Sequence, residues 1–255
     1  MLLSRSELQR YLSDLLNPQG YADYGPNGLQ IEGAESIRRI AFAVSATAHS
    51  AQAAALGQAQ ALIVHHGLFW KFHGPKTLTG PFARRVFPLV RHEINLFAYH
   101  LPLDAHPEVG NAAVLARALG MDELQPFGDY EGRPTGVKGR LTAPMSAAGW
   151  RDQMSAVLAH PVLLATPDEN ACVHTAGIIT GGANRDWPRA LREGLDAYVT
   201  GEMSEHDWHE SREAGMHMYA GGHSATERFG ILTLMERIGK EFGVECFFIP
   251  SDNPA

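Results

Sequence analysis

The feature that most constrains the fold is a regular alternation of short apolar segments with longer helix-like ones. Segments 39–46, 61–67 and 95–104 are typical of strands, and alanine-rich or amphipathic stretches of about 10–15 residues separate them. Because two neighbouring parallel strands need a crossover rather than a tight turn, this order predicts βαβ units around a mainly parallel sheet. The alternation continues to the end of the sequence, which therefore predicts an α/β fold.

Two parts of the chain have a similar plan. Residues 94–119 and 216–239 each give an apolar strand, then a polar turn with a histidine and a carboxylate, then a helix. An internal duplication and the independent occurrence of the same α/β pattern explain this similarity equally well. We predict a first domain at 1–125 plus 222–255, carrying most of the candidate ligands described below, and a second domain at 126–221.

Composition excludes several classes of protein. No apolar run approaches the roughly 20 residues that span a bilayer, and the N-terminal segment lacks the pattern of a signal peptide. Cys172 and Cys246 have no CxxC partner, which predicts two buried free thiols and a cytoplasmic location. The net charge of −7 argues against a generally basic surface for nucleic acid.

Two adjacent histidines, His65 and His66, end the apolar run "ALIV" and precede Gly67. Successive side chains of a straight strand point to opposite faces, so the pair cannot bind one ion from within a strand. At a strand end, where Gly67 lets the backbone turn, both rings can reach one pocket. In α/β folds that end of the strand is where binding sites lie. The alternative is a pair of hydrogen-bonded histidines at a sheet edge, and the two explanations are evenly balanced.

Three more candidate ligands follow other predicted strands. Asp104 follows the strand 95–104, and His223 follows the strand near 216–220, with Glu227 four residues later on the same face of a helix. Glu227 has an alternative role, because Ser224 and Glu227 are also spaced as a capping box. Together with the histidine pair, these residues form a mixed nitrogen and oxygen donor set, which fits Zn, Mn, Fe, Co or Ni.

At these residues the sequence resembles the Nif-three-like dinuclear-metal-centre proteins, known as GTP cyclohydrolase I type 2 homologues. The matching motifs are "NGLQIEG", "LIVHHGLFWK", "LFAYHLPLDAHPEVGN", "YVTGEMSEHDWHESREAG" and "YAGGHSATERFGI". They run from near the N-terminus to the last predicted helix, so the resemblance covers nearly the whole chain.

The resemblance implies a fold, an assembly and a ligand set. The fold is two similar, intertwined α/β domains with the metal site in the cleft between them, and the assembly is a toroidal homohexamer. Two divalent ions per chain are implied, with the ligands His65, His66, Asp104, His223 and Glu227. The chain is too short to hold the inserted domain of the longer family members.

Two neighbouring residues are candidates for a catalytic role. His100 lies four residues before Asp104, where it can act as a general acid or base or orient a ligand, or simply pack in the strand. Glu202 ends the strand "LDAYVTGE" and is a candidate general base or orienting carboxylate. Phe69 and Trp70 we interpret as packing residues rather than as a platform for stacking bases.

Two functions remain for such a site. The first is a metal-dependent hydrolase that acts on a small anionic substrate, possibly a nucleotide such as GTP, through a metal-bound hydroxide. The second is a metal-stabilised toroidal scaffold that binds nucleic acid or a partner protein without catalysis. Five side chains cannot fill the roughly eight to twelve coordination positions of two ions, and such open positions favour the hydrolase. A membrane partner is not expected, and nucleic acid is the less favoured ligand.

Overall fold

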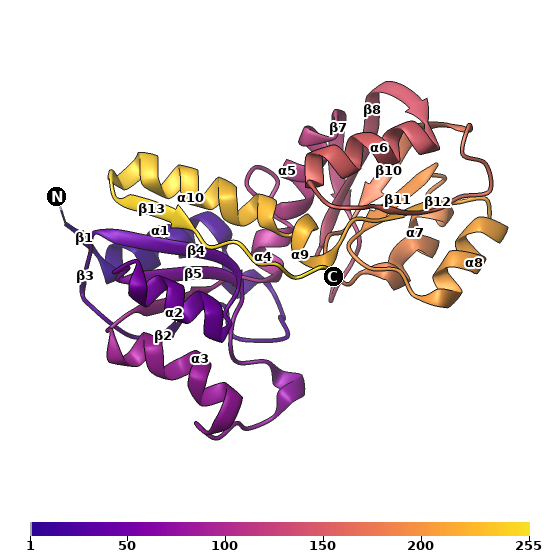
Figure 1. Ribbon diagram of the computed structural model, residues 1–255. Coiled ribbons are helices and arrows are strands. Elements are labelled where there is room, and N and C mark those ends of the chain that lie inside the picture. The colour runs from indigo at the N-terminus through magenta and orange to yellow at the C-terminus, as the bar shows by residue number, and fades with distance from the viewer. Residues whose placement is uncertain (1) are drawn as a thin grey trace. The chain divides into compact units, whose positions relative to one another are not determined.

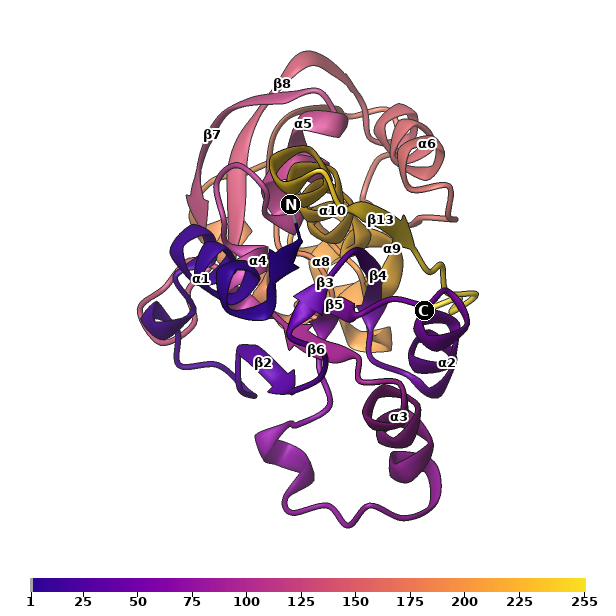
Figure 2. The same cartoon turned by 90° about the vertical axis from the view of Figure 1, so that its left-hand side faces the viewer.

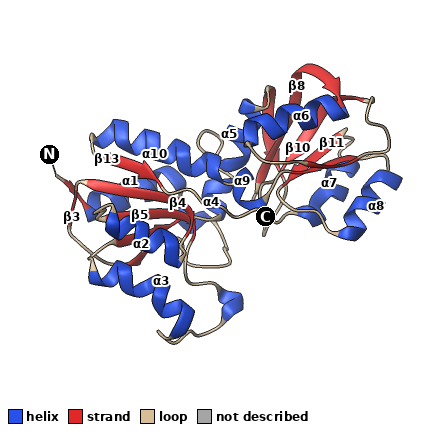
Figure 3. Cartoon of the chain, viewed as in Figure 1, coloured by secondary structure: helices blue, strands red, loops and turns tan. Residues whose placement is uncertain are grey.

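The computed structural model describes residues 2–255 and is an α/β protein, as the alternation predicted (Figures 1 and 3). Its contacts divide the chain into two compact units. The first unit contains the residues up to Leu103 and Ile231–Asp252, and the second contains Asp104–Gly230 and Asn253–Ala255. Residues 104–125 and 222–230, which the sequence groups with the first domain, make their contacts in the second unit. The histidine pair and the candidate ligands Asp104, His223 and Glu227 therefore belong to different units.

The first unit contains a five-stranded sheet in which only the last strand is antiparallel. In spatial order the strands are β13 (Glu245–Phe248), β4 (Arg39–Ser45), β5 (Ala61–His66), β6 (Asn95–Ala98) and β2 (Gly28–Ile31). The helices α1 (Arg5–Leu16) and α10 (Arg228–Phe242) cover one face, and α2 (Ala48–Leu56) and α3 (Gly80–Arg91) cover the other (Figure 1). Burial on both faces explains why the strands read as continuous apolar runs.

Smaller elements complete the first unit. They are β1 (Leu3–Ser4), which pairs with β3 (Ser36–Ile37), and the short 3-10 helices η1 (Pro18–Gly20) and η2 (Lys71–His73). Ser4 caps α1 by accepting a hydrogen bond from the backbone of Glu7 at 3.1 Å. Helix α3 continues through Pro88, and its residues Val86 and Leu89 are buried in the core.

The second unit contains a six-stranded mixed sheet. In spatial order its strands are β7 (Met121–Phe127), β8 (Gly136–Ser146), β10 (Cys172–Ile178), β11 (Ala197–Thr200), β12 (His217–Ala220) and β9 (Leu163–Ala165). The three central strands β10, β11 and β12 are parallel, and the outer strands are antiparallel. The helices and 3-10 turns of this unit are α5 (Asn111–Ala118), α6 (Ala147–Leu158), η3 (Asn184–Asp186), α7 (Trp187–Arg192), α8 (Glu205–Glu213) and α9 (His223–Thr226). Of the short helix α4 (Leu101–Asp104), only the last residue belongs to this unit.

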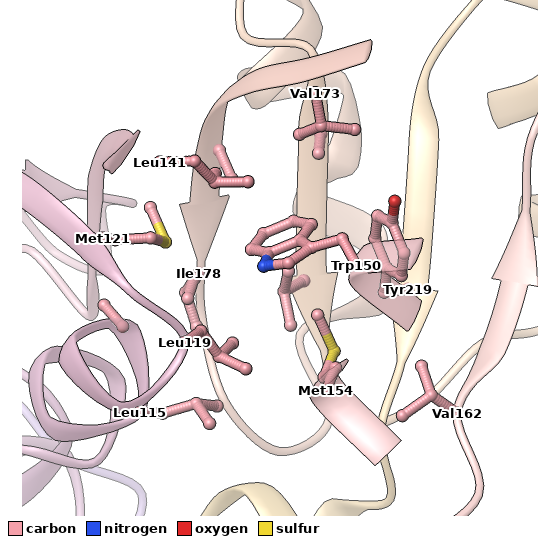
Figure 4. Packing of buried hydrophobic residues seen from close by; sticks show 14 of the residues in the cluster. Leu115, Leu119, Met121, Leu141, Trp150, Met154, Val162, Val173, Ile178 and Tyr219 are labelled. Atoms are coloured by element: carbon pink, nitrogen blue, oxygen red, sulfur yellow. The ribbon is translucent and has the colours of Figure 1, made fainter. Parts of the chain in front are cut away.

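The core of the second unit has Trp150 of α6 at its centre (Figure 4). The indole is fully buried and meets the ring of Tyr219 edge to face, with 5.1 Å between the ring centroids. Leu115 of α5, Leu119 just after it and apolar residues of β8 and β10 surround it. On the opposite face of the sheet, Trp187 and Ala190 of α7 pack against Tyr198. This packing fixes the carboxyl ends of β10, β11 and β12, from which the site residues of this unit extend.

Both units contain three parallel strands joined by helices, in the order β4–α2–β5–α3–β6 and β10–α7–β11–α8–β12. The candidate site residues follow the carboxyl ends of these strands in both units. The two cysteines are free, as predicted, but Cys172 is exposed and Cys246 only partly buried. Cys172 is the first residue of β10, and Cys246 lies in the edge strand β13. Among the described residues, no helix has the length and apolar character needed to cross a membrane.

Candidate metal centre

His65 and His66 lie at the carboxyl end of β5 with their ring centroids 4.6 Å apart. His65 is fully buried, and its Nδ1 lies 3.0 Å from the carbonyl oxygen of Tyr99. The Nδ1 of His66 lies 3.0 Å from the hydroxyl of Ser45, its register partner on β4. Each ring is therefore held by its Nδ1, and Nε2 is the nitrogen that can bind a metal.

Gly67 serves a different purpose from the predicted one. It does not adopt the left-handed conformation in which glycine is favoured. Instead, a Cβ at this position would lie 2.4 Å from the side-chain amide of Gln30, which accepts a hydrogen bond from the backbone of Leu68 at 2.8 Å. The glycine thus allows the segment "NGLQ" to pack against the residues that follow the histidine pair.

His100 follows the neighbouring strand β6 and completes a group of three histidines. One nitrogen from each of His65, His66 and His100 lies within 4.8 Å of the others. The Nδ1 of His100 lies 2.7 Å from Oδ1 of Asp23, a buried carboxylate. His100 is therefore not a simple packing residue of the strand, because a buried acceptor fixes its orientation beside the histidine pair.

Asp23 was not among the predicted site residues, because it lies in a loop with no periodic pattern. Its carboxylate accepts hydrogen bonds from the backbone of Tyr24 and Leu101 and from the amide of Asn27, at 2.6 to 2.9 Å. Burial alone would raise the pKa of Asp23, but the hydrogen bond and charge of His100 and the bonds from Asn27 and Leu101 lower it below 3.8. The only sequence signal was the nearby motif "NGLQIEG".

We expect Asp23→Ala to lower the free energy of unfolding by about 2–3 kcal/mol, because several buried donors lose their acceptor. Because the folded pKa of Asp23 lies below the unfolded value of 3.8, this stabilisation is complete above that pH and lost as the pH falls through the folded pKa. Urea titrations at neutral pH measure the difference. The exposed carboxylate of Asp129 supplies the control variant Asp129→Ala, which should change stability little; equal effects of the two substitutions would contradict this account.

His223, Glu227 and Glu202 form the corresponding group in the second unit. His223 begins α9, and its Nε2 lies 3.2 Å from Oε2 of the buried Glu227. Its Nδ1 lies 2.5 Å from Oε1 of Glu202, which follows β11. The alternative role of Glu227 in a capping box is not observed: the N-cap of α9 is Gly222, no side chain caps it, and Glu227 follows the last residue of the helix.

The two carboxylates determine the charge of His223. Burial works against a charged imidazole, but the hydrogen bonds and charges of Glu227 and Glu202 outweigh it and raise the pKa of His223 to about 9. The position between these carboxylates thus strongly favours a positive charge. A divalent cation, which requires the neutral imidazole, would satisfy the same carboxylates, so these residues fit a metal.

Asp104 is held by two side chains that sequence reasoning missed. Its Oδ1 accepts hydrogen bonds from the amide of Asn111 at 2.8 Å and from the hydroxyl of Thr180 at 3.2 Å. The other end of the Asn111 side chain accepts from the backbone of Gly230 at 2.7 Å, which ties Asp104 to the start of α10. A carboxylate held in this way is buried yet keeps oxygen atoms suited to a hard or borderline cation.

Gly181 follows β10, and because it has no side chain it leaves room for the carboxylate of Glu227. It has a φ of +70°, and a Cβ at this position would lie 2.0 Å from Oε1 of Glu227. Its backbone nitrogen donates to the hydroxyl of Thr226 at 3.1 Å, which joins this loop to α9. The sequence showed only a glycine pair after an apolar strand, with no sign that its neighbour in space is a carboxylate.

The predicted site residues lie in two groups, one in each unit. The first unit holds His65, His66 and His100, and the second holds Asp104, His223, Glu227 and Glu202. All donor atoms are imidazole nitrogens or carboxylate oxygens, and the two cysteines lie elsewhere in strands β10 and β13. The protein therefore contains groups of histidine, aspartate and glutamate side chains that can bind a divalent transition metal.

Comparison with known proteins gives matches along the whole chain. The family profile described as Duf34/NIF3 (NGG1p interacting factor 3) matches residues 3–254. A relative from Pasteurella multocida named GTP cyclohydrolase 1 type 2 homolog is 39% identical over 249 residues, which are 98% of each chain. A relative of the same name from Deinococcus radiodurans is 40% identical over 97% of this chain and 93% of its own length.

Two solved structures have nearly the same fold. The protein ybgI, described as of unknown function, superposes with a TM-score of 0.90 at 39% identity, covering 99% of this chain and all of its own. TTHA1606 from Thermus thermophilus superposes with a TM-score of 0.91 at 32% identity and equal coverage. These likenesses extend over both units of the chain.

Proposed function

The chain belongs to the Duf34/NIF3 family, as its motifs predicted, and from this premise we propose that it is a metal-dependent hydrolase acting on a small anionic substrate. In this proposal two divalent ions bind to each chain. The proposed ligands are His65, His66, Asp104, His223 and Glu227.

One observation carries the proposal: the Nδ1 of each proposed histidine ligand lies within hydrogen-bond distance of an oxygen. The three oxygens belong to the carbonyl of Tyr99, the hydroxyl of Ser45 and the carboxylate of Glu202. Metal-binding histidines have this arrangement, because the bond at one nitrogen fixes the tautomer and aims the other nitrogen at the ion. If these histidines only formed hydrogen bonds at a sheet edge, there would be no reason for all three rings, in both units, to be oriented through Nδ1 in the same way.

The remaining side chains have complementary roles in this proposal. Divalent ions bound at the site would polarise a substrate oxygen and activate water for hydrolysis. In this proposal His100, which is oriented by Asp23, transfers a proton to the leaving group. Glu202 holds the ring of His223 and raises its basicity. The GTP-like substrate is supported by the name of the curated relatives, for which opening of the imidazole ring of GTP would release formate.

The test is hydrolysis by protein loaded with Zn, Mn, Fe, Co or Ni, with formate release from GTP and phosphate release from simple phosphate esters as readouts. We expect His100→Gln to lower kcat by about 100-fold or more, and Glu202→Gln to lower metal affinity or activity by about 10–100-fold. The exposed residues His92 and Glu210 give the control variants His92→Gln and Glu210→Gln. Metal-loaded protein without turnover on any of these substrates would refute the hydrolase and favour the scaffold.

We also propose the homohexamer that the family resemblance implies and the cytoplasmic location that the cysteines predict. Family membership over the whole chain supports the assembly. Sedimentation velocity of the full chain tests it, and a monomer or dimer at micromolar concentration would contradict it.

A further inference from the structure

The basic residues of the chain are unevenly distributed. Residues 36–92 contain none of the 28 acidic residues of the protein but seven of its 21 lysines and arginines. The overall charge of −7 therefore conceals a segment of opposite sign. Local charge of this kind, rather than net charge, determines whether a surface attracts a polyanion.

Five of these cations lie close together in sequence on the surface of the first unit. Lys71 and Lys76 are in and after η2, and α3 presents Arg84, Arg85 and Arg91. All five are exposed, and none forms a salt bridge with a carboxylate of residues 2–255. Figure 2 shows η2, α3 and their connection at the lower margin of this unit. We call residues 69–91 the basic surface.

Aromatic side chains stand among these cations. Phe72 is 68% exposed, and its ring stacks on that of Trp70 with an interplanar angle of 19° and 5.6 Å between centroids. Phe69 is 39% exposed and contacts Phe82 edge to face. The expected packing role of Phe69 and Trp70 thus accounts for only part of their surface. Of the ten large hydrophobic side chains that are most exposed among the described residues, half lie in the basic surface.

We propose that the basic surface binds single-stranded nucleic acid, with the five cations along its phosphates and Phe72 stacked on a base. Proteins that bind single strands combine these two elements, a row of cations and flat aromatic faces. A single strand fits better than a duplex, because its bases are not held in base pairs and can stack on the ring of Phe72. The ring of Phe72 also meets that of His73 edge to face, with 4.6 Å between centroids, and its exposed flat surface matches a nucleobase better than a lipid chain. The inference rests on charge and exposure and is independent of the proposed hydrolysis.

The test is fluorescence anisotropy of a labelled oligothymidylate of about 20 nucleotides with the full chain, at salt concentrations between about 50 and 200 mM. We expect log K to fall with log salt with a slope of about −3.5, that is about −0.7 for each of five phosphate contacts. The variant Arg84→Gln/Arg85→Gln should bind at least about tenfold more weakly and reduce the slope by about 1.4. Phe72→Ala should weaken binding about tenfold without changing the slope, because it removes stacking but no charge.

The matched control is Arg10→Gln/Lys240→Gln, which removes the same charge from exposed positions of the same unit outside the basic surface. It should leave affinity and slope nearly unchanged, and an equal loss in this control would overturn the proposal. So would equal binding of a duplex, equal binding of poly-glutamate, or binding only to vesicles of phosphatidylcholine and phosphatidylserine. A change of oligomeric state in Phe72→Ala without a change in affinity would assign the surface to contacts between copies instead.

Discussion

We expect wild-type protein purified without chelators to carry about two divalent ions per chain, and His66→Ala and Glu227→Gln to carry one or none. His66 is only half buried, so its replacement removes a donor with little loss of packing. Glu227→Gln keeps the shape of a buried side chain but removes the charge that offsets a cation. Inductively coupled plasma mass spectrometry measures the metal content, and circular dichroism reports whether the fold is retained.

The controls for metal content are His92→Ala and Glu210→Gln, which change the same residue types at exposed positions in the same units. Both should keep the metal content of the wild type. Folded wild-type protein that contains no metal and binds neither added Zn nor added Mn would refute the metal centre. Loss of metal in the controls as well would show that the assay measures adventitious surface binding.

We expect Gly181→Ala to lose bound metal and hydrolytic activity almost as completely as Glu227→Gln. A Cβ at Gly181 would lie 2.0 Å from Oε1 of Glu227, so the carboxylate must leave its position facing His223. The substitution also forces alanine into a φ of +70°, which costs about 1–2 kcal/mol. Metal content and thermal denaturation together separate these two effects.

Gly194 is the matched control for the glycine prediction. It lies in the same unit with the same φ of +70°, and no atom lies within 4 Å of the position of its Cβ. Gly194→Ala should therefore lose a similar free energy of unfolding while it retains metal and activity. Equal metal content in the two variants would contradict the prediction, because it would show that Gly181 is not needed to make room for the side chain of Glu227.

Residues 36–92, which contain no aspartate or glutamate, show that the net charge of a whole sequence can hide a local basic surface. The net charge of −7 argues against nucleic acid only when the charges are mixed evenly, and here residues 36–92 contain no carboxylate side chain. The exposure of Phe72 and Arg84 was not predictable from the pattern, since η2 has no apolar period and Phe72 follows a buried strand by only a few residues. Only the structure shows that residues 71–81 all lie on the surface.

By itself, the sequence determined the α/β class, the family and the candidate donors, because hydrophobic periodicity and short motifs are local properties of the chain. It could not decide between two roles for Glu227, or show that Asp23, Ser45 and Thr180 hold the site residues. These partners are 21 to 77 residues away along the chain from the residues they hold. The parallel pairing of β4 with β5 brings Ser45 to His66, whereas Asp23 lies in a loop and Thr180 follows β10. The contacts follow from the pairing order of the strands and the packing of helices on both faces of each sheet, which only the tertiary structure fixes.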